Sequence, residues 1–415
     1  MNNLEYLDAK SKSTTNKNLE RLSNFFNIEE LNRLSMRSVS IVGTNGKTST
    51  ATCLFRLLCK LSITTCLFTS PHLINANERI SNNDGKISEE DMIRYLNEII
   101  EYENKNNLVL GYFETLFLIG SKLFLDTKAD FFIVEAGIGG RLDTTSIINS
   151  EIVALTNIGY DHTDVLGESL QEILLEKIRV SNRIKDLLIG ERTTHINFTS
   201  LIDKEMKMNN SSYHFRYSDS RNTSIERIDQ DFEMMNAFLA IDLMCMLFDR
   251  FPLVFKTKYK MEEPLSVEKA WETSKEGVPG RLEVVDDELC KILDGAHNLS
   301  GINVFLDSLE LKFEDIGTLN NRYPIPYFEC YLGIKNGKNF KQMIDALVRR
   351  EWVEIKLIDD NTFFDQMKTE EIKDYLNEIE IEVNYGSLKD FHSSKKPSIL
   401  LGSLYLVGEY KKEFQ

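Results

Sequence analysis

Short apolar runs alternate with helical patterns along most of the chain. Strand-like runs with β-branched character occur at residues 39–42, 65–68, 131–134, 152–158 and 187–189. Several of the stretches between them carry apolar residues at spacings of three and four, which indicates amphipathic helices. Strands that alternate with helices are typical of a mostly parallel sheet covered on both faces. The pattern therefore predicts an α/β fold, whose ligands collect beyond the carboxyl ends of the strands.

Two other segments are less regular. A helix is predicted over residues 16–35, where Leu19, Leu22, Phe25, Phe26 and Leu31 recur at helical spacing. Residues 202–230 are polar and rich in Asn, Ser and charge. We expect a loop or a helical excursion there.

The segment between the first expected strand and helix has a phosphate-binding pattern, and we call it the P-loop. It consists of Gly43, Thr44, Asn45, Gly46, Lys47, Thr48 and Ser49. A helix N-terminus favours an anion because its backbone N–H groups are unpaired. The two glycines let the backbone wrap around phosphate oxygens, the lysine supplies a charge, and Thr48 can offer a hydroxyl to Mg²⁺. An ordinary turn that caps a helix is the alternative.

A second series of strands and helices follows Pro279-Gly280. Its apolar runs cover residues 289–293, 327–334, 353–358 and 399–401. A segment of about 135 residues has a usual domain size. We therefore expect an N-terminal P-loop domain with a mostly parallel sheet over residues 1–276. A smaller, Rossmann-like α/β domain is expected over residues 277–415.

The composition limits the partners of this 415-residue chain. Its net charge of −16 opposes a general attraction to nucleic acid or to an anionic membrane. The six cysteines contain no C-x-x-C pair, which favours a reducing compartment. No apolar segment approaches the ~20 residues of a membrane span, and no leader pattern is found at the N-terminus. We expect a cytoplasmic protein.

Polar residues follow two of the expected strands. Glu135 ends the run Phe131-Phe132-Ile133-Val134, and a carboxylate at a strand end beside a P-loop is a typical Mg²⁺ ligand. The alternative is a solvated glutamate that begins a glycine-rich turn. His162 follows the next strand and could bind metal or phosphate. Its alternative is a turn histidine bonded to Asp161 or Thr163.

Further candidates are Lys177 and three residues of the second domain. Lys177 by itself reads as an exposed helix lysine. Arg281 and His297 could meet phosphate, and Asp294, which closes an apolar strand, could accept from a ribose hydroxyl. The alternative for all three residues is that their segments only form turns, because Pro-Gly and Asp-Gly are strong turn signals.

Taken in order, eight segments resemble the folylpolyglutamate synthase and dihydrofolate synthase family, a branch of the ATP-dependent Mur ligases. The resemblance spans residues 18–410. Its motifs are G-T-N-G-K-T-S at 43–49, T-S-P-H-L at 69–73, E-R-I at 78–80, E-A-G-I-G-G-R-L-D at 135–143, D-H-T-x-x-L-G at 161–167, P-G-R-L-E at 279–283, D-G-A-H-N at 294–298 and G-S-L-Y-L-V-G-E at 402–409. One departure is Ile178-Arg179, where the family has Ala-Gly.

The resemblance implies a role for several residues. Ser70, Glu135 and His162 match the magnesium ligands of the family, and Asn236, Arg281 and Asp294 match its ATP-binding positions. Lys177 matches a lysine that the family carbamylates. The predicted catalytic residues are Lys47, His162 and Lys177. The segments near the pterin contain Thr69, Pro71, His72, Phe113 and Glu114.

The resemblance also implies an activity. A substrate carboxylate attacks the γ-phosphate of MgATP to give an acyl phosphate, and the amine of L-glutamate displaces phosphate, while the C-terminal domain closes over the nucleotide. The acid would be dihydropteroate, a folate, or both, and we expect a monomer. Two alternatives stay open: a Mur-type ligase that joins an amino acid to a UDP-muramoyl peptide, and a P-loop NTPase that acts as a switch or motor.

Overall fold

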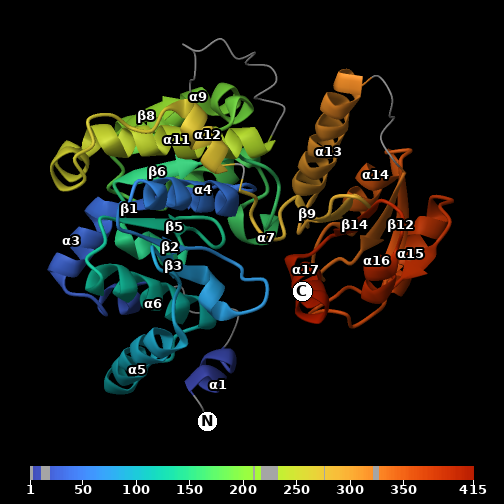
Figure 1. The fold of residues 1–415 in the computed structure, drawn as a ribbon. Coiled ribbons are helices and arrows are strands. Elements are labelled where there is room, and N and C mark those ends of the chain that lie inside the picture. Colours follow the sequence, from blue (N-terminus) through green and yellow to red (C-terminus); the bar gives the residue numbers. More distant parts are fainter. Residues whose placement is uncertain (1–2, 11–18, 209–210, 216–231, 275, 321–326) are drawn as a thin grey trace. The chain divides into compact units, whose positions relative to one another are not determined.

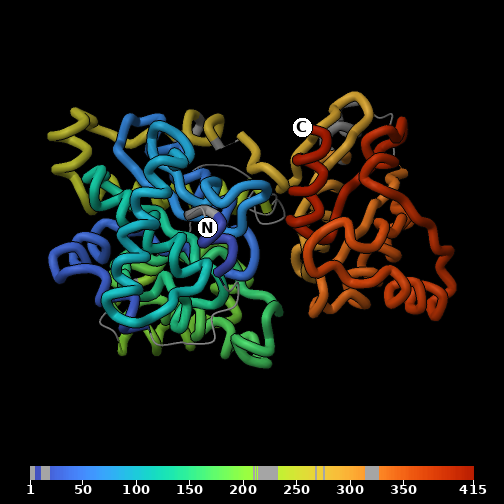
Figure 2. The backbone as a smooth tube through the Cα atoms, turned by 90° about the horizontal axis from the view of Figure 1, so that it is seen from below, coloured from blue at the N-terminus to red at the C-terminus, as the bar shows by residue number. Residues whose placement is uncertain are grey.

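The computed structural model describes residues 3–10, 19–208, 211–215, 232–274, 276–320 and 327–415. The described residues of 1–225 and 233–276 form one compact unit, unit 1, and those of 277–415 form a second, unit 2. Figure 1 shows a sheet with helices in each unit, and Figure 2 follows the chain through unit 1 from blue to yellow and through unit 2 from orange to red.

Unit 1 is built on an eight-stranded sheet in the order β4-β3-β2-β5-β1-β6-β7-β8. The six strands from β2 to β8 pair in parallel, and β3 and β4 add an antiparallel edge. Their bounds are β1 Ser38–Val42, β2 Thr65–Phe68, β3 Ile80–Asn82, β4 Gly85–Lys86, β5 Phe131–Glu135, β6 Ile152–Leu155, β7 Asp186–Ile189 and β8 Ser212–Phe215. Because β1, β5 and β6 are adjacent, their carboxyl ends lie side by side.

Helices lie on both faces of this sheet (Figure 1). The helices of unit 1 are α1 Asn3–Asp8, α2 Glu20–Ser23, α3 Ile28–Arg37, α4 Lys47–Lys60, α5 Glu89–Asn106, α6 Tyr112–Asp126, α7 Thr163–Leu166, α8 Leu170–Ile178, α9 Arg192–Met208, α11 Phe232–Arg250 and α12 Val267–Ser274, with shorter turns η1 Ala76–Arg79, η2 Thr144–Ile148 and η3 Leu253–Lys258. Phe132 and Val134 of β5 face α5 and α6, and Phe131 packs against Phe251 and Phe255. The alternation of β5 therefore buries both faces of the central sheet.

Unit 2 has a six-stranded sheet in the order β13-β12-β11-β14-β10-β9, parallel except for β9. The strands are β9 Glu283–Asp286, β10 Lys291–Leu293, β11 Phe328–Leu332, β12 Val353–Ile358, β13 Asn384–Gly386 and β14 Ser398–Leu401, and the helices are α13 Leu299–Asn320, α14 Phe340–Val348, α15 Thr369–Glu378, α16 Leu388–Ser393 and α17 Leu404–Phe414. The predicted α/β fold with mostly parallel sheets is confirmed. Among the residues that the structure describes, no helix is long and apolar enough to span a membrane.

Two local expectations differ from the structure. The helix expected over residues 16–35 is interrupted, because Asn27 caps a new helix by accepting from the Glu29 and Glu30 amides at 2.9 Å. The polar segment 202–230 is partly regular, since α9 continues to Met208 and β8 adds an edge strand. Residues 209–210 and 216–230 of that segment lie outside the described residues.

Candidate active site

The P-loop joins β1 to α4, and the residues that follow β6 hold its shape. The Thr44 amide donates to the Asn157 carbonyl at 3.1 Å, and the Asn45 amide donates to the Asn157 side-chain oxygen at 2.9 Å. The Thr156 hydroxyl donates to the Asn45 carbonyl at 2.6 Å. A Cβ added to Gly43 would lie 1.8 Å from the Thr156 hydroxyl oxygen. Two polar side chains of the neighbouring strand end therefore fix this loop.

Lys47 is the first residue of α4, and its ammonium folds back over the P-loop. Its Nζ donates to the Gly43 and Thr44 carbonyls, both at 3.0 Å. A lysine charge above the amides of a helix N-terminus is an arrangement that attracts phosphate.

Glu135 ends β5 with a carboxylate that links three elements. Its side chain is only 2% exposed. The Thr48 hydroxyl of α4 donates to Oε1 at 2.9 Å, and the Ser70 amide, from the loop after β2, donates to Oε2 at 3.0 Å. The structure thus brings the predicted ligands Glu135 and Ser70 together with Thr48 at the mouth of the P-loop.

This group fits a magnesium ion. In the part of the chain that the structure describes, no cluster of three or more His, Cys, Asp or Glu side chains could hold a metal by itself. Magnesium takes one or two carboxylates, keeps several waters and binds substrate phosphates. The Glu135 carboxylate and the Thr48 hydroxyl are the hard oxygen donors that such a site requires.

Lys177 in α8 is buried, contrary to its reading as an exposed helix lysine. Its side chain is 4% exposed, and Nζ donates to the Gly43 carbonyl at 2.8 Å. Burial, together with repulsion from the Lys47 ammonium, lowers the pKa of Lys177 to about 7 from its ordinary value of 10.5. A large fraction of this amine is therefore neutral near neutral pH.

The glycine-rich turn after β5 allows α8 to come this close. A Cβ on Gly140 would lie 2.3 Å from the Lys177 carbonyl oxygen, so a larger residue would push α8 away. Asp143 shapes the turn, since its carboxylate accepts from the Ile138 and Thr145 amides at 2.9 Å. Burial raises the pKa of Asp143.

Two other predicted residues lie beside the P-loop unit. His162 precedes α7 with a φ of 50°, its amide donates to Asp161 Oδ1 at 3.0 Å, and its Nε2 is 3.9 Å from Asp161 Oδ2. The hydrogen bond between His162 and Asp161 that the sequence suggested as an alternative is thus present. A metal-binding role of His162 stays a prediction. Asn236 of α11 is buried, and its Oδ1 accepts from the Thr50 hydroxyl at 3.3 Å. A Cβ on Gly46 would lie 2.2 Å from that oxygen, which places Asn236 at the start of α4.

The loop between β2 and β3 carries the predicted substrate residues Thr69, Pro71 and His72. Pro71 is exposed, and the Thr69 amide donates to the Arg79 carbonyl at 2.8 Å. Arg79 Nε donates to His72 Nδ1 at 3.0 Å, and the His72 ring lies 6.4 Å from that of Tyr112 at the start of α6.

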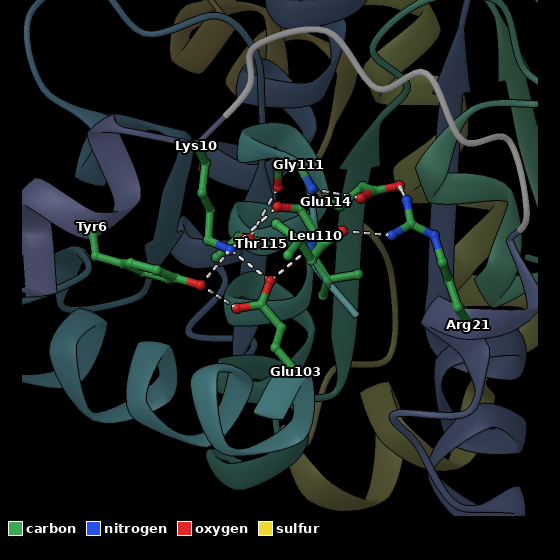
Figure 3. Close-up of polar contacts among 9 residues, drawn as sticks. Tyr6, Lys10, Arg21, Glu103, Leu110, Gly111, Glu114 and Thr115 are labelled. Atoms are coloured by element: carbon green, nitrogen blue, oxygen red, sulfur yellow. Dashed lines mark hydrogen bonds and ion pairs between the residues drawn. The ribbon is translucent and has the colours of Figure 1, made fainter. Parts of the chain in front are cut away.

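Phe113 and Glu114, the other predicted substrate residues, point in different directions. Phe113 packs on Phe68 with ring centroids 5.5 Å apart and touches the turn at Gly137. Glu114 is buried, and its carboxylate accepts from the Gly111 amide at 2.7 Å and from Arg21 at 2.5 Å (Figure 3). Phe113 therefore lies at the strand ends, while the Glu114 carboxylate is engaged by α2 and by its own helix. A substrate role for either stays a prediction.

The predicted residues of unit 2 lie on two loops that are bonded to each other. The buried Asp294 accepts from the Leu282 and Ala296 amides at 2.7 Å, which ties the P-G-R-L-E loop to the D-G-A-H-N loop. The His297 ring contacts the Gly295 carbonyl at 2.8 Å, and the Arg281 amide donates to the Val278 carbonyl at 3.0 Å. Nucleotide contacts by Arg281, Asp294 and His297 stay predictions.

Sequence reasoning missed the residues that hold the loops. Thr156 and Asn157 lie in the strand expected at residues 152–158, and Asp143 lies in the E-A-G-I-G-G-R-L-D motif, but neither pattern predicts that they support loops. A polar pair directly after a buried strand, beside a P-loop, is the signal that could have identified Thr156 and Asn157.

Known proteins resemble this chain in sequence and in fold. Residues 41–242 match the family described as Mur ligase middle domain. The dihydrofolate synthase/folylpolyglutamate synthase of Buchnera aphidicola subsp. Schizaphis graminum is 29% identical over 425 residues, covering 99% of this chain and 95% of that protein. The Bacillus subtilis protein of the same name is 27% identical over 92% of this chain and 91% of its own length.

A solved structure has the same architecture. The bifunctional folylpolyglutamate synthase/dihydrofolate synthase of Yersinia pestis, complexed with AMPPNP and a manganese ion, aligns with a TM-score of 0.75. The alignment covers 99% of this chain and 96% of that one at 21% sequence identity. This likeness shows the fold.

The contact between Gly43 and Thr156 predicts a specific cost of substitution. Gly43 and Gly85 both have positive φ, 149° and 118°, but a Cβ on Gly85 would meet nothing within 4 Å. We expect Gly43→Ala to lose about 1–3 kcal/mol more unfolding free energy than Gly85→Ala, because only the first is overpacked. Urea unfolding of both variants measures the difference. Equal losses would mean that Gly43 does not pack on Thr156.

Proposed function

The chain belongs to the folylpolyglutamate synthase and dihydrofolate synthase family, and we propose that it joins L-glutamate to a pterin carboxylate in an ATP-dependent reaction. The acid is dihydropteroate, a folate, or both. Unit 1 would bind ATP and the pterin, and unit 2 would supply further nucleotide contacts. A monomeric state, a cytoplasmic location and the absence of nucleic acid partners stay predictions.

The observation that carries the proposal is the convergence of groups on the P-loop. Thr48 and Glu135 are bonded to each other at its mouth, and the Lys47 and Lys177 amines both bond to the Gly43 carbonyl. Two nitrogens and two hard oxygens therefore surround the loop that would hold the γ-phosphate.

The proposed reaction has two steps. An oxygen of the substrate carboxylate forms a bond to the γ-phosphorus, the bond to the β-phosphate oxygen breaks, and ADP leaves. The glutamate nitrogen then bonds to the acyl carbon, phosphate leaves with the electron pair of the broken C–O bond, and the nitrogen loses a proton. Lys47 and the P-loop amides would stabilise the charge of the transferred phosphoryl group, the main contribution in such transfers. Magnesium held by Thr48 and Glu135, with Ser70 and His162 as further candidates, would neutralise phosphate charge.

We further infer that Lys177 is carbamylated. An amine adds to CO₂ only in its neutral form, and burial beside Lys47 lowers the pKa of Lys177 to about 7. Carbamylation would replace a buried cation by an anion whose oxygens suit Mg²⁺.

The two alternatives have less support. The Buchnera and Bacillus relatives, which cover 99% and 92% of this chain, are named dihydrofolate synthase/folylpolyglutamate synthase, not UDP-muramoyl peptide ligases. A switch or motor gives no role to the bonded loops of unit 2 around Asp294.

The first prediction of the proposed function concerns the substrates that ATP turnover requires. ADP release should need both a pterin acid and L-glutamate, because the γ-phosphate activates an acid for amide formation. Positional isotope exchange in ATP should need the acid but not glutamate. Rapid hydrolysis of ATP with neither substrate would favour the switch or motor, and turnover with a UDP-muramoyl peptide would favour the Mur-type ligase.

The second prediction concerns the proposed magnesium ligands. Glu135→Gln and His162→Ala should each lower kcat on the order of 10²-fold or more, since each removes a group that holds charge at the phosphoryl site. Glu98→Gln, a partly exposed glutamate of α5, is the control and should retain activity. Near-normal kcat at saturating Mg²⁺ in a folded variant would exclude that residue as a ligand.

The third prediction concerns Lys177 and pH. With a pKa of about 7, the amine is mostly neutral above that pH and mostly protonated below it. Incorporation of ¹³C-bicarbonate at Lys177, followed by carbamate NMR, should therefore fall as the pH decreases through about 7. Lys177→Ala should lose most activity, and a small carboxylate should restore part of it. A bare amine at pH 8 with bicarbonate and MgATP, together with an active Lys177→Ala enzyme, would contradict carbamylation.

A further inference from the structure

Two ion pairs, one buried and one partly buried, connect Lys10, which follows α1, and Arg21 of α2 to α5 and α6 (Figure 3). Lys10 Nζ lies 2.6 Å from Glu103 Oε1, with side chains 2% and 3% exposed. Arg21 Nη2 lies 2.5 Å from Glu114 Oε1, and Glu114 is 2% exposed. We call these four residues the charged clasp.

The clasp bonds to the backbone of the short loop at residues 107–111 as well as within itself. Arg21 Nη1 donates to the Val109 carbonyl at 2.9 Å, and Lys10 Nζ donates to the Leu110 carbonyl at 3.2 Å. In the other direction, the Leu110 amide donates to Glu103 at 2.5 Å and the Gly111 amide donates to Glu114 at 2.7 Å. Each clasp residue therefore holds one polar group of the two consecutive peptide units that join residues 109, 110 and 111.

Stability alone does not account for this arrangement. Removing two charges from water costs several kcal/mol per ion, and buried pairs can often be replaced by apolar residues without loss of stability. Charged hydrogen bonds, however, are directional and fix the position of the groups that they join. Tyr6 strengthens the same network, since its hydroxyl donates to Glu103 at 2.8 Å, and burial with this contact raises the pKa of Tyr6 to about 12.

The loop held by the clasp leads directly into residues that touch the candidate site. Tyr112 contacts the His72 ring, and the Arg79 guanidinium lies 5.5 Å from the Tyr112 ring centroid. Phe113 packs between Phe68, at the end of β2, and the turn at Gly137 after β5. The first turn of α6 therefore abuts both strand ends that carry the predicted substrate and metal residues.

We propose that the clasp residues Lys10, Arg21, Glu103 and Glu114 are positioning residues that set the affinity for the pterin acid by fixing Tyr112 and Phe113. This inference rests on the proposed function. The clasp contacts described above involve the loop before α6 and not the P-loop or Glu135, so we expect their effect on the acid and not on ATP.

The same two helices provide a matched control. Lys122 of α6 pairs with Glu98 of α5 at 3.4 Å, toward the end of α6 that is distant from the loop. Lys122→Met removes a charge between α5 and α6 without touching residues 107–111.

The experiment compares Arg21→Met, Arg21→Lys and Lys122→Met with the parent protein. For Arg21→Met we expect the KM for dihydropteroate to rise on the order of 10-fold, with kcat and the KM for ATP within about 2-fold, because ground-state positioning is lost. Arg21→Lys should restore part of the affinity, since one ammonium can still reach Glu114. Hydrogen exchange of residues 107–116 should be faster in Arg21→Met, and Lys122→Met should leave the KM and this exchange unchanged.

Several outcomes would overturn the proposal. A lower melting temperature for Arg21→Met with an unchanged KM for the acid would show a structural role alone, and an equal rise in Lys122→Met would show a general effect of helix packing. If Arg21→Met did not fold, the KM of Arg21→Lys for the acid would be compared with that of the parent protein and of Lys122→Met in the same way. A parent protein without acid-dependent turnover would overturn the proposed function and this inference together, whereas an active parent with an unaffected Arg21 variant overturns this inference only.

Discussion

Two lysine amines donate to one carbonyl oxygen of the P-loop in unit 1. The Nζ atoms of Lys47 and Lys177 lie 3.0 and 2.8 Å from the Gly43 oxygen. Like charges this close repel each other, and burial of Lys177 adds a desolvation cost, so the pKa of that lysine falls. Lys47 beside the amides of a helix N-terminus favours an anion at this site. The arrangement is possible only because Gly140 lets α8 approach the turn and Thr156 holds Gly43 in place.

Buried carboxylates have a common use throughout the chain. Asp143, Asp294, Glu103 and Glu114 each accept backbone N–H groups of a loop that leaves a strand or enters a helix. A hydrogen bond to a charged group contributes about 1.5–3 kcal/mol, more than a neutral one, and its direction is fixed. These hydrogen bonds order loops that would otherwise sample many conformations. The few side chains with a proposed role in the reaction therefore depend on several buried carboxylates that hold the loops.

The sequence predicted the parallel sheets well, since buried strands such as β2 and β14 are short apolar runs with clear ends. It also indicated that Glu135 and the P-loop would meet, because adjacent parallel strands end at one edge. It could not predict the break at Asn27, where one capping side chain outweighs a continuous apolar spacing. Nor could it show that Lys177 is buried or that Glu114 pairs with Arg21, 93 residues away. Both depend on tertiary contacts that leave no local pattern.

Arg179 shows why the departure from the family motif beside Lys177 is compatible with the site. Residues two apart on a helix point to nearly opposite sides, so Arg179 does not share the face that Lys177 presents to the P-loop. Its guanidinium instead makes two hydrogen bonds to Glu205 of α9, at 2.7 and 2.8 Å, and this pairing raises the pKa of Arg179. Ile178 between them packs in the core with Leu174. The added bulk and charge are therefore taken up by contacts with α9 and with the core. The Lys177 amine itself bonds to the Gly43 carbonyl and feels the charges of Lys47, Asp161, Asp143 and Glu176.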